Sequence, residues 1–166
     1  HLIAFGDEAL LTGPLMGELG AFLNQPNPYY PDGVNLNFAK ILGEDELFVR
    51  TYERGVGFTN ACGTGMSATS LAFALTHPTL GHFETPITVY NPGGLVKTLL
   101  HSVHHHYQIE LIGNATVTHQ LEIADDLLAA ANFTTDQIVV TETGEDAAYQ
   151  QFVATLPTPV KVAVKD

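Results

Sequence analysis

The stretch ERGVGFTNACGTGMSA, residues 53–68, holds the single cysteine of the chain, Cys62, in a glycine-rich turn. Residues 47–52 before it are rich in β-forming side chains, whereas the residues after it are apolar nearly all round a helix as far as His77-Pro78. The pattern predicts a strand, a tight turn and a buried helix, in that order. Cys62 would then lie at the start of the helix.

A thiol at a helix start lies beside N–H groups that have no partner within the helix and that carry the positive end of its dipole. This field favours the thiolate, so we expect the pKa of Cys62 to be lowered. The glycines let a ligand approach the free amides, which makes the turn a candidate anion site. A carboxylate bound there would place its α-carbon next to the sulfur, as proton removal α to a carboxylate requires. This chemistry indicates racemisation or epimerisation.

Other readings of the same stretch fit less well. Residues 55–60 end in Asn where a dinucleotide-binding fingerprint has a small residue, and the sequence CGTG lacks the P-loop lysine. A cysteine hydrolase would also place its thiol at a helix start, with a His as the base. The structural alternative is a small buried residue in a tight turn, and the polar neighbours Glu53 and Arg54 argue against it.

The composition limits the class of protein. The 166 residues, of which 45% are hydrophobic, suffice for one core. Eighteen acidic and six basic residues give a net charge of −12, and the basic residues form no cluster, so no nucleic acid is expected as a partner. Residues 1–166 hold no basic stretch followed by an apolar one and no apolar run of about 18 residues, so we expect no membrane partner and a cytoplasmic, reducing location.

Hydrophobic periodicity predicts an α+β fold. A helix over residues 15–23 and strands over 34–41 and 47–52 precede the motif, and strand-like sequence over 83–123 follows it. We expect residues 1–123 to form a mostly antiparallel, β-barrel-like sheet wrapped around the central apolar helix.

Residues 124–166 are expected to form a C-terminal α/β extension. Its predicted elements are a helix over 125–132, a strand over 137–142, a helix over 145–156 and a strand over 159–164. At the other end, HLIAF reads as a strand that begins without an initiator Met, so we expect the chain to be a fragment of a longer protein.

The segment VRTYERGVGFTNACGTG, residues 49–65, resembles the second cysteine signature of the diaminopimelate epimerase family. YPDGVNLNF at 30–38, the opening HLI and GNA at 113–115 are also similar to family segments, and the resemblance extends over residues 1–123. It implies a two-lobed epimerase of lysine and peptidoglycan biosynthesis that interconverts LL- and meso-diaminopimelate without pyridoxal phosphate, other cofactor or metal. This chain would be the C-terminal lobe, with an amino diacid and an N-terminal lobe as its partners.

The resemblance also assigns roles. Cys62 would be one of two thiol acid/base groups, and Glu53 would lie beside it. The substrate-binding and supporting positions would be Asn35, Arg54, Gly63, Thr64 and His1. Since the first cysteine signature is absent from residues 1–166, the isolated chain should not turn over substrate.

Among these positions, Gly63 and Thr64 would offer amides to the substrate carboxylate. Asn35 and Arg54 would hold the far end of the diacid, and His1 would support the thiol of the other lobe.

Two residues depart from the family pattern. Phe58 stands where the family usually has Glu, and Asn60 stands where it usually has a small or apolar residue. Two alternatives therefore stay open: a related isomerase or racemase of the same fold with another substrate, and a non-catalytic anion-binding domain.

The run HSVHHH, residues 101–106, is the other candidate for chemistry. In a continuous strand His104 and His106 would share a face with Glu110 and could chelate a divalent ion. The alternative is a solvated strand face, and the thiol mechanism requires no metal.

Overall fold

The computed structural model describes residues 1–104 and 106–161. Contacts within the chain divide it into two compact units, one formed by residues 1–113 with the segment that begins at Pro157, the other by Asn114–Leu156. The first unit therefore ends earlier than the boundary expected at residues 123 and 124, and it includes a segment from the far end of the sequence.

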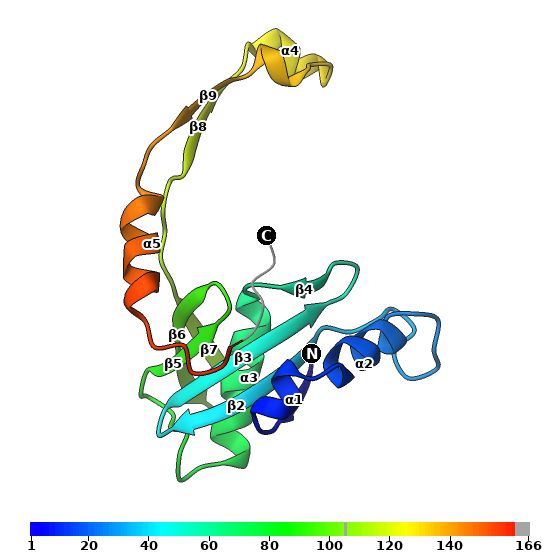
Figure 1. Ribbon diagram of the computed structural model, residues 1–166, viewed down its shortest axis with the longest axis vertical. Helices are drawn as coiled ribbons and strands as arrows, with labels where there is room; N and C mark the ends of the chain where they lie inside the picture. Colours follow the sequence, from blue (N-terminus) through cyan, green and yellow to red (C-terminus); the bar gives the residue numbers. More distant parts are fainter. Residues whose placement is uncertain (105, 162–166) are drawn as a thin grey trace. The chain divides into compact units, whose positions relative to one another are not determined.

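The first unit is built on a seven-stranded mixed sheet that curves as a half-barrel and carries few helices (Figure 1). Its strands are β1 (Leu2–Phe5), β2 (Leu36–Gly43), β3 (Glu46–Glu53), β4 (Gly57–Thr59), β5 (Ile87–Asn91), β6 (Gly94–Val103) and β7 (His106–Ile112). The order is β1-β2-β3-β5-β6-β7, and β4 pairs with β3. The pairs β1–β2 and β3–β5 are parallel, and the other described pairs of this sheet are antiparallel.

Alternate residues of β2 belong to two different buried hydrophobic clusters, one on each face of the strand. Leu36 and Phe38 belong to a buried cluster with α1 (Glu8–Thr12) and α2 (Leu15–Leu23), whereas Ala39 belongs to a cluster with α3. This follows from the period of two in a strand, which places successive side chains on opposite faces. The helix α2 has the bounds predicted for residues 15–23.

Helix α3 (Gly63–Thr76) is the helix predicted to follow the cysteine motif. It contacts β1, β2, β3, β5, β6 and β7, and Figure 1 shows it on the side of β2 and β3 away from α1. Met66, Phe73 and Ala74 of α3 are buried among apolar residues of the sheet. The buried hydroxyls of Thr69 and Ser70 donate to backbone oxygens one turn earlier, so they are not left unpaired.

The second unit contains a two-stranded antiparallel sheet, β8 (His119–Glu122) with β9 (Val139–Glu142). Its helices are α4 (Asp125–Ala130), a 3-10 turn at Thr135–Gln137 and α5 (Asp146–Thr155). None of its residues is buried, so the unit has no hydrophobic core of its own.

The sequence predicts a strand near the end of the chain and no membrane-spanning segment. The strand predicted over residues 159–164 falls largely outside the described residues, and residues 159–161 are not in a strand. Among the helices that the structure describes, none combines the length and hydrophobicity needed to span a bilayer.

Candidate functional site

Cys62 is the N-cap residue of α3. Its backbone is extended, and its carbonyl accepts the first helical hydrogen bond, from the N–H of Met66, at 2.9 Å. The side chain is 7% exposed, and Sγ lies 3.7 Å from Oγ1 of Thr64. The motif therefore places the thiol beside the first turn of the helix, as its sequence predicts.

The environment of Cys62 raises the pKa of its thiol, first of all because burial removes water from the thiolate. The nearby Glu53 carboxylate raises the pKa further, whereas the Gly65 N–H and the Thr64 hydroxyl lower it. The lowered pKa expected from the helix dipole is wrong for this chain, because the sequence motif does not reveal how deeply the sulfur is buried.

Glu53 lies at the end of β3 and is oriented by a residue that the sequence reasoning missed. Its Oε1 accepts a hydrogen bond from Oγ1 of Thr59 at 2.7 Å. The antiparallel pairing of β3 and β4 brings Thr59 opposite Thr51, so the short strand β4 carries the hydroxyl back to the carboxylate. Two strands therefore hold Glu53 near the thiol.

Arg54 and Asn35, from distant parts of the chain, are bonded to each other. The backbone N–H of Arg54 donates to Oδ1 of Asn35 at 2.9 Å, and its Nη1 donates to the carbonyl of Asp32 at 3.0 Å. Both residues line a surface hollow of about 190 Å³. The lining residues are His1, Gly33, Val34, Asn35 and Arg54.

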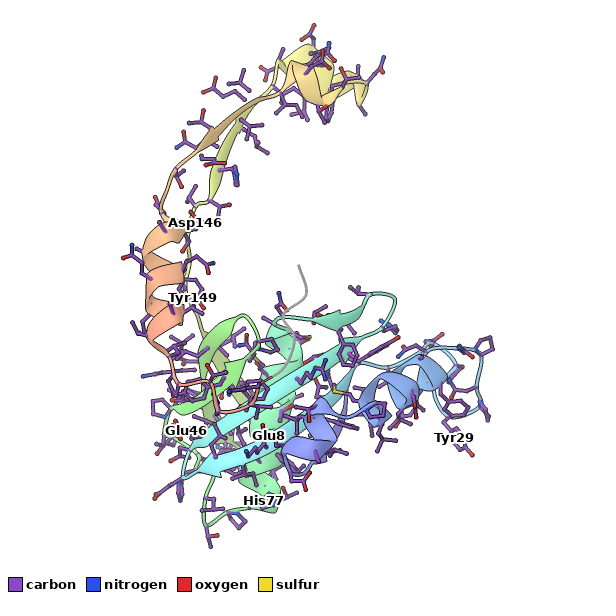
Figure 2. The ribbon with its side chains drawn as sticks, in the orientation of Figure 1. Glu8, Tyr29, Glu46, His77, Asp146 and Tyr149 are labelled. Carbon is purple, nitrogen blue, oxygen red and sulfur yellow. The ribbon has the colours of Figure 1, made fainter. Side chains whose placement is uncertain are left out.

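The loop that leads to Asn35 is held by Asn24 at the end of α2. The Asn24 amide donates to the carbonyl of Val34 at 3.0 Å and accepts from its N–H at 2.9 Å. The tip of the loop is free of this restraint: Tyr29 is 72% exposed and points away from the unit (Figure 2). The asparagine fixes the part of the loop that borders the hollow.

The predicted site residues fall into two groups. Cys62, Glu53 and Thr64 lie together at the start of α3, with Gly63 as the first residue of the helix. His1, Asn35 and Arg54 lie together around the hollow, which Cys62, Gly63 and Thr64 do not line. Glu53 and Arg54 are neighbours in the sequence and connect the two groups.

Asn37 connects the same regions and was missed from the sequence. It is 0% exposed, its Oδ1 accepts from Oγ1 of Thr51 at 2.9 Å, and its Nδ2 lies 3.2 Å from Nδ1 of His1. The signal was present, because alternation along 34–38 places Asn37 opposite the apolar face of Leu36. Only the position of α3 shows that this opposite face is also buried.

Phe58, which departs from the family pattern, has packing contacts. Its ring lies edge-on to Tyr52 with the centroids 5.2 Å apart, and the guanidinium of Arg50 lies 4.0 Å from its centroid. Burial lowers the pKa of Arg50 from its usual value. In this chain the aromatic ring at position 58 therefore covers the partly desolvated guanidinium of Arg50.

The histidine run does not form one strand. His104 has a φ of 48° in the turn between β6 and β7, so the expected alternation of faces is broken. His101 instead lies between two carboxylates, with Nδ1 2.7 Å from Glu84 and Nε2 3.2 Å from Glu110. Residue 105 lies outside the described residues. In the described part of the chain, the residues spaced to hold a metal ion are Glu44, Asp45 and His82.

The sequence of this chain is similar to those of known proteins. Residues 16–118 match the sequence model of the family described as diaminopimelate epimerase. The chain is 48% identical over 157 residues to the diaminopimelate epimerase of Enterococcus faecalis and 49% identical over 158 residues to that of Ligilactobacillus salivarius. These matches cover 94% of this chain but 47% and 48% of the two relatives. The chain thus spans about half the length of these proteins.

Among solved structures, the chain is similar to a phenazine biosynthesis protein of the PhzF family from Bacillus anthracis. The TM-score is 0.47 at 14% identity, and the match covers 73% of this chain and 36% of that one.

Proposed function

Because this chain belongs to the diaminopimelate epimerase family, we propose that it is the C-terminal lobe of an epimerase that interconverts LL- and meso-diaminopimelate with two thiols. In this proposal the first unit is the main body of the lobe, with its sheet wrapped around α3. The observation that carries the proposal is the placement of Cys62 at the start of α3, with Glu53 and Thr64 beside the sulfur.

The raised pKa of the Cys62 thiol determines whether Cys62 donates or accepts a proton first. Near neutral pH the thiol of the free lobe holds its proton, so Cys62 starts as the acid. A thiolate of the other lobe removes the α-proton from one face of the substrate, and the Cys62 S–H delivers its proton to the opposite face of the carbanion. The substrate then has the inverted configuration, and the two sulfurs have exchanged protonation states.

The remaining residues bind the substrate. The first-turn amides of Gly63 and Thr64 have no acceptor within the helix and hold the α-carboxylate, which lowers the barrier to carbanion formation. Asn35 and Arg54 hold the far end of the diacid at the hollow that they line. His1 supports the thiol of the other lobe. Each step is a proton transfer or a hydrogen bond, and it needs no cofactor or metal.

The test is solvent deuterium incorporation at the α-carbon, followed for both stereoisomers in the full-length protein. Cys62→Ala should abolish inversion, because nothing else in the proposed site can give or take the proton on that face. Cys62→Ser should be nearly as inactive, since an alkoxide forms poorly near neutral pH. The matched control is Thr76→Ala, at the far exposed end of the same helix, and it should keep full activity.

The isolated chain should be inert in the same assay, because it has one thiol and can serve one face only. Inversion at the wild-type rate in full-length Cys62→Ala would refute the two-thiol proposal. If the full-length protein binds the diacid but incorporates no deuterium, it is a non-catalytic anion-binding domain. If deuterium enters a different amino acid and not the diacid, the protein is an isomerase or racemase of the same fold with another substrate.

A further inference from the structure

Asn37 is a buried polar residue that the proposed reaction does not use. Its side chain lies against Gly65 of α3, and the two ends of its amide have different partners. Oδ1 accepts a hydrogen bond from Oγ1 of Thr51 at 2.9 Å, whereas Nδ2 lies 3.2 Å from Nδ1 of His1. The amide therefore bridges β3 and the residue that precedes β1.

Two backbone carbonyls decide which end of the amide faces His1. The oxygens of Leu2 and Asn35 lie 3.4 and 3.3 Å from Nδ2 of Asn37. A carbonyl oxygen only accepts, so a rotated amide would place oxygen against oxygen and lose both contacts. The nitrogen of the Asn37 amide therefore faces His1.

This orientation fixes the protonation of the His1 ring. An amide NH₂ group can only donate, so the ring nitrogen that faces it must present a lone pair. A neutral imidazole with a lone pair on Nδ1 carries its proton on Nε2. We propose that Asn37 is a positioning residue that holds His1 neutral with the proton on Nε2, so that His1 offers a donor, and not a base, to an anion at the hollow it shares with Asn35 and Arg54.

The Asn37 amide is packed closely against the first turn of α3. A methyl group at Gly65, in the first turn of α3, would overlap Oδ1 of Asn37 and lie 3.2 Å from Sγ of Cys62. The amide is therefore enclosed between the strands and the helix that carries the thiol. One buried side chain thus relates the orientation of His1 to the turn that holds Cys62.

The identity of the anion rests on the proposed function. A carboxylate of the diacid and a thiolate of the other lobe are both anionic acceptors, and each requires a donor. In the full-length protein, a shift of the His1 Nε2 signal on adding the diacid would identify the carboxylate. A shift on alkylating the other lobe's cysteine would identify the thiolate. No shift with either would refute the donor role.

The test of the positioning role is nitrogen NMR of full-length protein labelled with ¹⁵N-histidine, with His1→Gln to assign the signal. Wild-type His1 should show a single tautomer, protonated on Nε2. Asn37→Asp has nearly the same shape but offers an acceptor to Nδ1, so His1 should gain a proton there and remain doubly protonated to higher pH. Asn91→Asp, a buried asparagine that bonds Met66 and Gly93, is the matched control and should leave His1 unchanged.

A wild-type His1 that carries its proton on Nδ1 would overturn the proposal, and so would an unchanged tautomer in folded Asn37→Asp. If that variant does not fold, the wild-type spectrum still decides. The kcat/KM of Asn37→Asp should fall about tenfold near neutral pH, as for a lost hydrogen bond to a charged group. If the protein proves to have no epimerase activity, the tautomer result stands, so the two failures can be told apart.

Discussion

Cys62 experiences two opposing effects, and the structure indicates which is larger. Burial and the Glu53 carboxylate raise the pKa of the thiol, and they outweigh the Gly65 N–H and the Thr64 hydroxyl that lower it. Near neutral pH the thiol of Cys62 therefore holds its proton. A helix start alone favours the thiolate, so the burial of the sulfur decides that Cys62 is protonated, which is the form that the proposed acid role requires.

We predict that the thiolate absorbance of Cys62 in the isolated chain titrates above the value of about 8.5 for a free cysteine. Since the chain has a single cysteine, no other thiol contributes. Glu53→Gln should lower the midpoint, because it removes a nearby negative charge. Thr64→Val should raise it, because it removes a hydroxyl that stabilises the thiolate. A wild-type midpoint at or below 8.5 would contradict the burial effect.

His101 should make stability depend on pH. Hydrogen bonding to Glu84, and then to Glu110, raises the pKa of His101. The folded state therefore binds the proton more tightly than the unfolded chain, whose His pKa is about 6.5. The stabilisation is complete below that value and is lost as the pH rises through the folded pKa.

The measurement is the denaturant midpoint of wild type and His101→Gln between about pH 6 and pH 9. The variant should be less stable at the acidic end, and the difference should shrink as the pH rises. His119→Gln is the control, because its ring contacts the neutral Thr118 hydroxyl, and its difference should not follow this course. A constant or growing difference for His101→Gln would rule out the ion pairs as its cause.

Among the secondary-structure elements, the close approach of α3 to β2 depends on Gly65. Alanine is the better helix former by about 1 kcal/mol. Here, however, its methyl group would overlap Oδ1 of Asn37 and press on Sγ of Cys62. Asn37 is enclosed and cannot move aside cheaply, so the overlap should outweigh the gain in helix propensity.

We predict that Gly65→Ala destabilises the first unit by about 1–3 kcal/mol, the usual cost of overpacking a core. The measurement is urea unfolding followed by far-ultraviolet circular dichroism. Ser67→Ala, two residues further along the same helix and half-buried, is the control and should change stability little. Equal or greater stability of Gly65→Ala would show that the helix can move away from the strand.

Elements with strong local signals could be predicted from the sequence. The helix at 15–23 and the strand, turn and helix around Cys62 follow from periodicity and glycine placement, which are local properties. The parallel pairing of β3 with β5 joins segments separated by α3, and no local pattern encodes it. The turn at His104, which has a positive φ, was missed because residues 101–108 contain no Gly, Pro, Asn or Asp to mark a turn.

Some residues of the candidate site could likewise be predicted from the sequence, and others could not. The motif and its resemblance identified Cys62 and Glu53, which lie close in sequence and in space. Thr59 and Asn37 act through contacts made across strands, and their roles depend on the register of β3 with β4 and on the depth of α3. Burial, which sets the pKa of the thiol, is a property of the whole tertiary structure.

On the scale of the whole chain, the core of the first unit is completed by a residue from the far end of the sequence. Val160 is 2% exposed and belongs to the buried cluster that contains Leu11, Met16 and Phe48. The segment from Pro157 thus belongs with residues 1–113, although the whole second unit lies between them in sequence. The cluster beside α1 and α2 is therefore complete only when the segment that follows the second unit packs into it.

Val160→Ala should therefore destabilise the first unit by about 2 kcal/mol, through lost burial and the cavity left behind. The matched control is Val139→Ala in β9, where the side chain is 60% exposed and the change should stay within about 0.5 kcal/mol. Both are measured by urea unfolding, with the ring signals of Phe38 and Phe48 followed by NMR, because these rings lie in the same cluster as Val160. If Val160→Ala left the midpoint and these ring signals unchanged, the returning segment would not be part of the core, and residues 1–113 would hold their fold without it.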